Sequence, residues 1–234
     1  MNKRIIHIFT AVIIWGCVLQ ACKKEASPYE QDTPVVNINQ NSLDFLKAQT
    51  GTYDSLLYIL HKLPQLEDSL INHSVTFFAP QDISILTAIQ NINVTRTRSG
   101  KAAWIIDSVP LPVWDTLMRR YMVAGIVTPD SIRFADGVDL VTMSGYWHTS
   151  EETGDDVFSP YKMHADLVKQ STSGSTSTNK QRIQFSDKNF SRFRTDWSSS
   201  YVKTSSLITT NGVLHLLEPN HVFGFSSFVT FINR

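Results

Sequence analysis

The apolar residues of this chain change their period partway along the sequence. Tyr53, Leu56 and Leu60 follow the three-to-four-residue spacing of an amphipathic helix. After Gly125, apolar and polar residues alternate instead, as they do across residues 138–142. Helices followed by strands predict an α+β fold rather than an alternating α/β one. Further helices are expected around residues 85–89 and 112–122, and a buried strand at residues 75–79.

A β-hairpin is predicted near the C-terminal end. Two apolar segments, 206–210 and 213–217, are joined by Asn211-Gly212. This dipeptide favours a type I′ turn, whose central residues both need positive φ. The Ser/Thr-rich segment 171–180 predicts the tip of a second hairpin.

The N-terminus has the pattern of a secretory signal. Lys3 and Arg4 precede an apolar stretch that is too short to span a membrane. Leu19-Gln20-Ala21-Cys22 follows and resembles the lipobox of bacterial lipoproteins, in which the chain is cut before a lipid-modified cysteine. We therefore expect residues 1–21 to be a signal peptide, with Cys22 lipidated and 22–42 a flexible tether. The expected location is the cell envelope, at the outer membrane, with the face left open.

Only two cysteines are present, Cys17 and Cys22. If Cys17 leaves with the signal and Cys22 carries lipid, the mature chain has no cysteine for a disulfide, a metal site or a nucleophile. Residues 43–234 are then expected to form one domain that is stabilised by packing, with insertions in its loops.

The balance of charge excludes one class of partner. The chain has 21 basic and 21 acidic residues and no basic stripe. We therefore expect no nucleic-acid partner. We also predict no cofactor and no metal ion.

Two motifs together resemble the fasciclin family of extracellular modules. Residues 76–85, TFFAPQDISI, are similar to the family's first signature, and residues 210–217, TNGVLHLL, to its second. A helix at Leu117–Val123 resembles a further family segment, with Met122 in place of the usual histidine. The resemblance implies a β-wedge of two antiparallel sheets with a helical layer, and adhesion or ligand binding rather than catalysis. The apparent insertions relative to the family pattern are residues 94–111, 146–161 and 190–203.

Tyr146, Trp147 and His148 are the candidate ligand-binding residues. They lie in one of the insertions, and aromatic side chains on loops can stack on sugar rings. The alternative is that Trp147 closes the edge of the core. Trp104 and Trp197 raise the same question in the other insertions.

Asn211, Gly212 and His215 are interpreted as structural. No second ligand lies at strand spacing from His215, so a histidine that bonds its neighbours is favoured over a metal ligand. The acidic segment 151–156 lacks the alternating oxygens of a calcium loop and is interpreted as solvated. The aromatic residues of 223–232 are expected to pack within the molecule, with a partner-docking edge as the alternative.

The sequence therefore predicts a non-enzymatic, envelope-anchored module that binds a glycan or a protein. The alternative is an accessory subunit of an outer-membrane nutrient (glycan) uptake complex, in which contact with an outer-membrane protein is the main task. No catalytic residues are predicted, because the sequence has no nucleophile elbow and no convincing pair of carboxylates.

Overall fold

The computed structural model describes residues 35–169, 181–203, 206–225 and 227–232. The predicted signal peptide 1–21, Cys22 and most of the tether lie outside the described residues, as does the Ser/Thr-rich segment 171–180.

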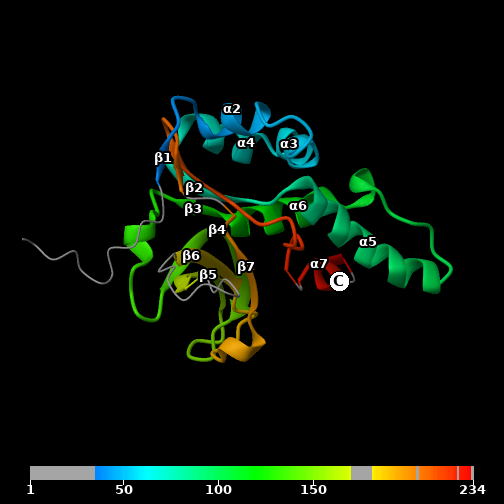
Figure 1. The fold of residues 1–234 in the computed structure, drawn as a ribbon. Coiled ribbons are helices and arrows are strands. Elements are labelled where there is room, and N and C mark those ends of the chain that lie inside the picture. Colours follow the sequence, from blue (N-terminus) through cyan, green and yellow to red (C-terminus); the bar gives the residue numbers. More distant parts are fainter. Residues whose placement is uncertain (1–34, 170–180, 204–205, 226, 233–234) are drawn as a thin grey trace, which may run out of the picture. The chain divides into compact units, whose positions relative to one another are not determined.

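Nine strands form one mixed sheet in the order β1-β8-β9-β2-β3-β4-β5-β6-β7 (Figure 1). Their bounds are β1 (Val36–Asn37), β2 (Val75–Ala79), β3 (Met122–Ala124), β4 (Val138–Thr149), β5 (Asp156–Lys169), β6 (Gln181–Asp187), β7 (Ser198–Tyr201), β8 (Leu207–Ile208) and β9 (Gly212–Leu216). The α+β class is confirmed, but the strands do not divide into two purely antiparallel sheets. β1 pairs with β8, and β2 with β9, in parallel. Both pairs join segments far apart in the sequence, which leaves room for the long crossover that parallel pairing requires.

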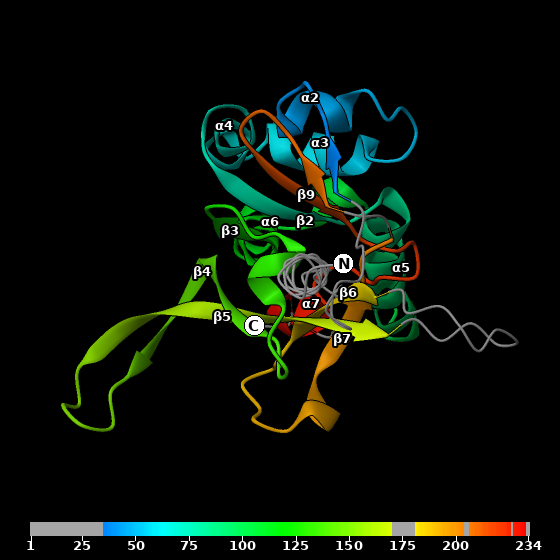
Figure 2. The same cartoon turned by 60° about the vertical axis from the view of Figure 1, so that its left-hand side comes forward.

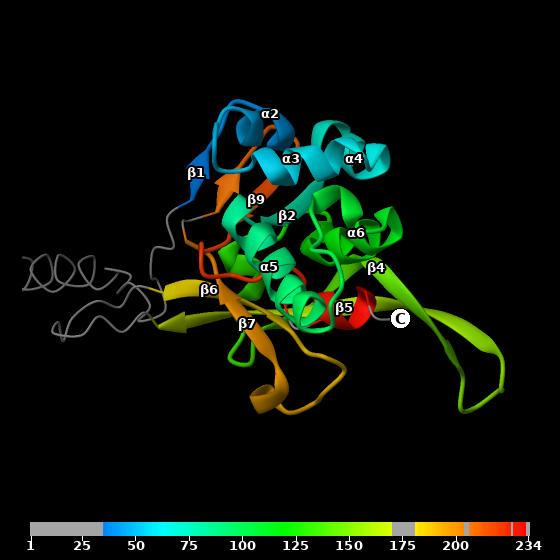
Figure 3. The same ribbon diagram turned by 90° about the vertical axis from the view of Figure 1, so that its right-hand side faces the viewer.

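Six α-helices lie in the described part of the chain, in two groups (Figure 3). α2, α3 and α4 pack together near β9, α6 packs against β4 and α7, and α5 connects the two groups through its contacts with α3 and α7. The helices are α2 (Ser42–Lys47), α3 (Asp54–His61), α4 (Pro64–Asn72), α5 (Asp82–Arg98), α6 (Leu111–Met118) and α7 (Ser227–Ile232). Four 3₁₀ turns connect elements, namely η1 (Ile106–Ser108), η2 (Arg119–Tyr121), η3 (Pro129–Ile132) and η4 (Arg194–Asp196).

The core lies on both sides of β2. All five residues of this strand are buried, as its continuous apolar sequence predicts. Leu56 and Leu60 of α3 are buried with them, on the helix face that the sequence spacing identifies. The ring of Phe78 stacks on that of Phe185 from β6, with centroids 3.9 Å apart. The strand therefore joins the helical half of the core to the β half.

The ordered domain begins before residue 43. The amide of Val36 donates to the carbonyl of Ser206 at 3.0 Å, and that of Ile38 donates to Ile208 at 2.7 Å. These bonds add β1, which lies within residues 22–42, to the sheet edge.

The helix expected at Leu117–Val123 is shorter in the structure. α6 ends at Met118, and Met122 lies in β3 opposite Phe77 of β2. Pairing with β2 gives the backbone of Met122 a partner that a longer helix would not provide. By contrast, α5 is longer than the sequence indicates. It continues through Arg98, although the residues at its C-terminal end are polar and show no helical spacing of apolar residues.

The β8–β9 hairpin is confirmed, but its predicted turn type is wrong. Ile208 pairs with Val213, and the amide of Thr209 donates to the carbonyl of Gly212 at 2.9 Å. The turn is therefore centred one residue earlier than predicted, and neither Asn211 nor Gly212 has positive φ.

Strands β4 and β5 form a long antiparallel arm that extends beyond the rest of the sheet (Figure 2). β6 pairs with β5 only from Met163 onward. The edge of β5 at residues 159–162 therefore faces the loop that follows β6 rather than another strand.

Candidate functional site

The arm places the predicted aromatic residues on its two faces. Tyr146 pairs across the strands with Ser159, and Trp147 with Phe158. Because side chains alternate along a strand, Tyr146 and His148 share one face and Trp147 lies on the other. The side chain of Trp147 is 71% exposed, and its ring meets that of Phe158 edge-on at 5.5 Å. Trp147 therefore does not close the edge of the core.

Gly145 shapes this second face. A Cβ on Gly145 would lie 2.1 Å from the tip of the Phe158 ring. The tip of the Phe158 ring thus lies over the backbone of Gly145, next to Trp147, and the two rings form an exposed apolar pair two residue pairs from the end of the β4–β5 ladder. We call Trp147 and Phe158 the arm pair.

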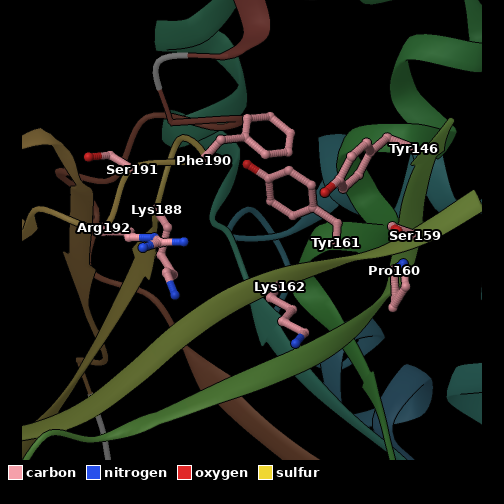
Figure 4. Close-up of a pocket in the computed structure, with 9 residues that line it drawn as sticks. All are labelled: Tyr146, Ser159, Pro160, Tyr161, Lys162, Lys188, Phe190, Ser191 and Arg192. Atoms are coloured by element: carbon pink, nitrogen blue, oxygen red, sulfur yellow. The ribbon is translucent and has the colours of Figure 1, made fainter. Parts of the chain in front are cut away.

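The other face carries three aromatic rings at the edge of a hollow (Figure 4). The ring of Phe190 lies edge-on to Tyr146 at 4.9 Å and to Tyr161 at 5.3 Å. Tyr161 is buried beneath, and Tyr146 is half-buried. The hollow encloses about 370 Å³. It is lined by Tyr146, Ser159, Pro160, Tyr161, Lys162, Lys188, Phe190, Ser191 and Arg192.

Phe190 is held there by a strained turn. Asn189 and Phe190 have φ values of 49° and 61°, in the left-handed region that residues with a Cβ rarely adopt. The amide of Asn189 donates to Oδ1 of Asp187 at 2.9 Å, and its side-chain Nδ2 donates to the carbonyl of Asp196 at 3.0 Å. These bonds fix a backbone that presents a phenyl ring 68% exposed to solvent. Strain of this kind, maintained by surrounding contacts, is concentrated at functional sites in proteins.

A buried ion pair supports the aromatic rings from below. Nη1 of Arg120 donates to Oδ2 of Asp187 at 2.9 Å and to Oγ of Ser227 at 3.1 Å. The Arg120 guanidinium lies 3.8 Å from the centroid of the Tyr161 ring, and the Tyr161 hydroxyl donates to Oδ1 of Asp187. Burial raises the pKa of Tyr161 above its ordinary value, so this hydroxyl stays protonated and able to donate. Asp187 therefore anchors Arg120, Tyr161 and the Asn189 turn together.

A second hollow adjoins the first and shares Tyr146, Tyr161 and Phe190 with it. It encloses about 760 Å³. Its lining also includes Thr116, Arg120, Gly145, Trp147, Asn189, Ser227, Thr230 and Phe231. The Nε of Arg120, which lines this hollow, is buried and has no hydrogen-bond partner among the described residues.

The first hollow carries an excess of positive charge. Lys188 is paired, because its Nζ lies 2.8 Å from Oδ2 of Asp139. Lys162 and Arg192 are exposed, and neither pairs with a carboxylate of the described residues. No aspartate or glutamate lines either hollow within the described part of the chain.

Sequence reasoning missed Phe190, Tyr161 and Lys162, because the contacts that bring them together connect strands far apart in the sequence. Phe190 begins one of the predicted insertions and Tyr161 ends another, and these are the sequence signals at the three positions.

Trp104 and Trp197, the tryptophans of the other two insertions, are half-buried and contact their own loops. The amide of Trp104 donates to Oδ1 of Asn93 at 2.6 Å, and Arg96 lies over the Trp104 ring at 4.4 Å. The Nε1 of Trp197 donates to the carbonyl of Ser191 at 3.0 Å. Both close their own loops, and neither lines a hollow described above.

His215 is fully buried between strands. Its Nε2 donates to the carbonyl of Val127 at 2.9 Å, which leaves Nδ1 to accept from the Ser206 hydroxyl at 3.3 Å. Burial lowers the pKa of His215 to about 4, so the ring is neutral at physiological pH.

Asn211 joins three elements. Its Oδ1 accepts from the amide of Ser42 at 3.0 Å, at the start of α2. Its Nδ2 donates to the carbonyls of Leu70 at 3.0 Å and His73 at 3.2 Å, at the end of α4. The side chain thus satisfies backbone groups that helix ends leave free.

The acidic segment 151–156 forms the tip of the arm. The amide of Ser150 donates to the carbonyl of Asp155 at 2.8 Å, which closes the turn. Among the described residues, no cluster of three or more His, Cys, Asp or Glu side chains could hold a metal ion. None of the helices described has both the length and the apolar character to cross a bilayer.

The likeness of this chain to known proteins lies in its structure. No family model matches the chain, and no curated protein matches it. The chain is similar in structure to the FAS1 domain pair of the insect cell adhesion molecule fasciclin I, with a TM-score of 0.40 and 14% sequence identity. The match covers 79% of this chain and 46% of that one, so the chain spans less than half of the domain pair.

Proposed function

We propose that this chain is a non-enzymatic module that is anchored to the bacterial cell envelope and binds a glycan along the β4–β5 arm. The observation that carries the proposal is the exposure of Trp147 and Phe190 beside two connected hollows. Large aromatic residues that are left exposed to water are typical of binding surfaces.

The arrangement suits a sugar chain. Aromatic faces contact the apolar C–H surfaces of a sugar ring, and neighbouring polar groups fix its orientation. The first hollow offers both kinds of group, because Tyr146 and Phe190 stand beside Ser159 and Ser191 (Figure 4). A glycosidase would need two carboxylates facing the substrate. The described lining has none, which favours binding over hydrolysis.

The predicted lipid anchor gives the binding site its location. Cys22 would attach the chain to the membrane, and the fasciclin-like motifs at 76–85 and 210–217 favour a role in adhesion. Cys22→Ala should block lipidation and release the protein from the membrane fraction. Membrane retention of the variant, measured by detergent phase separation, would contradict the anchor.

Binding is tested with Trp147→Ala on a panel of immobilised polysaccharides. We expect retention of this variant to fall about tenfold or more on the glycan that retains the wild type, as for loss of a central aromatic contact. Phe134→Ala is the matched control, because Phe134 is equally exposed but precedes β4 and lines neither hollow. An equal loss in both variants, or in neither, would count against the arm as the binding site.

The second candidate function is an accessory subunit of an outer-membrane nutrient (glycan) uptake complex. The arm pair favours it, because two exposed apolar rings on a projecting hairpin could contact another protein. Gentle solubilisation of the membrane and co-purification distinguishes the two functions. Recovery of a stoichiometric outer-membrane partner that Trp147→Ala releases would favour the accessory role.

A further inference from the structure

We infer that the ligand of the first hollow is an acidic glycan, whose carboxylate or sulfate groups contact Lys162 and Arg192. This inference rests on the proposed glycan-binding function and specifies its chemical class.

The charges of the hollow are the first step. Three cationic side chains line it, and only Lys188 is neutralised, by Asp139 at 2.8 Å. Lys162 on β5 and Arg192 on the loop after β6 stand on opposite walls without an ionic partner among the described residues (Figure 4). Cations that converge on one cavity raise the local concentration of anions and reward a ligand that supplies the missing negative charge.

The position of the aromatic rings is the second step. The hollow opens where β6 ends, so that the edge of β5 at 159–162 is free of a strand neighbour. Along this edge Tyr161 and Lys162 point to alternate sides of the strand, as Figure 4 shows. A chain-like ligand that crosses the edge would meet the rings of Tyr146 and Phe190 on one side and the cationic groups on the other. Alternating apolar ring faces and anionic substituents are the pattern of a uronic-acid or sulfated polysaccharide.

The strained Asn189–Phe190 turn is the third step. The same loop carries Lys188 and Arg192, so the hydrogen bonds that hold Asn189 and Phe190 also fix the backbone between the two cationic residues. Phe190 and Arg192 are thus carried by one preorganised segment, which lowers the entropy cost of binding.

A nucleic acid also combines ring faces with anions, but the charge of the chain disfavours it. Removing residues 1–21 takes away Lys3 and Arg4, which leaves 19 basic and 21 acidic residues. A net charge near −2 opposes the long polyanionic backbone of a nucleic acid, whereas a glycan can engage one or two charged groups locally.

The test compares matched acidic and neutral polysaccharides. Immobilised polygalacturonate is compared with its methyl ester, and chondroitin sulfate with chondroitin that is both desulfated and carboxyl-reduced, with polyuridylate as a nucleic-acid arm. We expect the full-length protein to be retained by at least one acidic form, about tenfold more strongly than by its neutral counterpart, and to be released as salt is raised.

Lys162→Gln/Arg192→Gln should abolish this preference. The matched control is Arg98→Gln/Lys101→Gln, which removes the same charge from two exposed residues at the end of α5. The control should keep the preference. A preference that survives the first double variant, or is lost in both, would overturn the inference.

Three further outcomes would overturn the inference, with different consequences for the proposed function. Equal retention by acidic and neutral forms, reduced by Trp147→Ala, would overturn the inference and leave glycan binding in place. Retention by no polysaccharide would overturn both. Stronger retention by polyuridylate would replace the acidic glycan with a nucleic acid.

Discussion

Gly212 lies so close to Val75 that a Cβ on Gly212 would stand 2.1 Å from the Val75 carbonyl oxygen. Residue 212 begins β9 and pairs in parallel with Val75 of the central strand β2. The glycine is therefore required by the approach of two backbones and not by a left-handed turn.

Gly212→Ala should destabilise the fold by about 3 kcal/mol, because the added methyl group overpacks a site walled by backbone. The free energy of unfolding in urea measures the effect. Thr210→Ala is the control, since Thr210 is exposed in the same turn and its loss should change stability by about 0.5 kcal/mol or less. A Gly212→Ala variant as stable as this control would show that the close approach is not required.

Asn211→Ala should also destabilise the fold, by roughly 2–3 kcal/mol. The substitution removes one acceptor and two donor bonds that connect the turn to α2 and α4, each contributing about 1 kcal/mol. Amide hydrogen exchange should locate the loss at Ser42 and in the last turn of α4. If exchange became faster evenly over the sheet, and no faster at Ser42 and α4 than elsewhere, Asn211 would not be a local connection between the turn and the two helices.

Two buried histidines make stability depend on pH. Burial lowers the pKa of His215 to about 4 and that of His221 to about 3, from 6.5. As the pH falls, these histidines take up protons in the unfolded chain before they do so in the folded one. Their contribution to stability is therefore fully present above pH 6.5 and is lost as the pH drops toward 4 for His215 and 3 for His221. At about 1.4 kcal/mol per unit of pKa, His215 alone accounts for roughly 3 kcal/mol.

Urea unfolding between pH 7 and 4 tests this dependence. His215→Gln and His221→Gln should each flatten the fall in stability, although both variants start from a lower value at pH 7. His61→Gln should not, because the His61 side chain is 82% exposed. If His215→Gln and His221→Gln both leave the pH dependence of the unfolding free energy unchanged, carboxylates alone cause the acid sensitivity.

The sequence predicts local features of this fold better than its long-range pairings. β2 and the helix at 54–61 follow directly from their apolar pattern, since continuous burial and a 3.6-residue period are both visible in the chain. The parallel pairing of Val75 with Gly212 cannot be predicted from the local sequence, because it depends on contacts between distant segments. The same limit explains Met122, which β2 draws into a strand.

The candidate site divides in the same way. Tyr146 and Trp147 are visible as unusual aromatic residues in an insertion, and Trp147 is exposed in the structure. Tyr161, Lys162 and Phe190 join them only because β6 stops at Asp187 and the chain turns back along the edge of β5. The buried Arg120–Asp187 pair that supports them connects η2 with β6 across 67 residues. No local pattern carries that information.

Phe190 offers a direct measure of the strain at the site. Phe190→Ala removes the ring and keeps a Cβ at φ 61°, whereas Phe190→Gly removes both. The glycine variant should therefore be more stable than the alanine variant by about 1 kcal/mol, the reverse of their usual order. Both should lose retention on the glycan that binds the wild type, since each lacks the ring between Tyr146 and Tyr161. Phe193→Ala is the control, because Phe193 is exposed in the same loop but lines neither hollow. A glycine variant less stable than the alanine variant would mean that the turn is not strained, and full retention by both would remove Phe190 from the site.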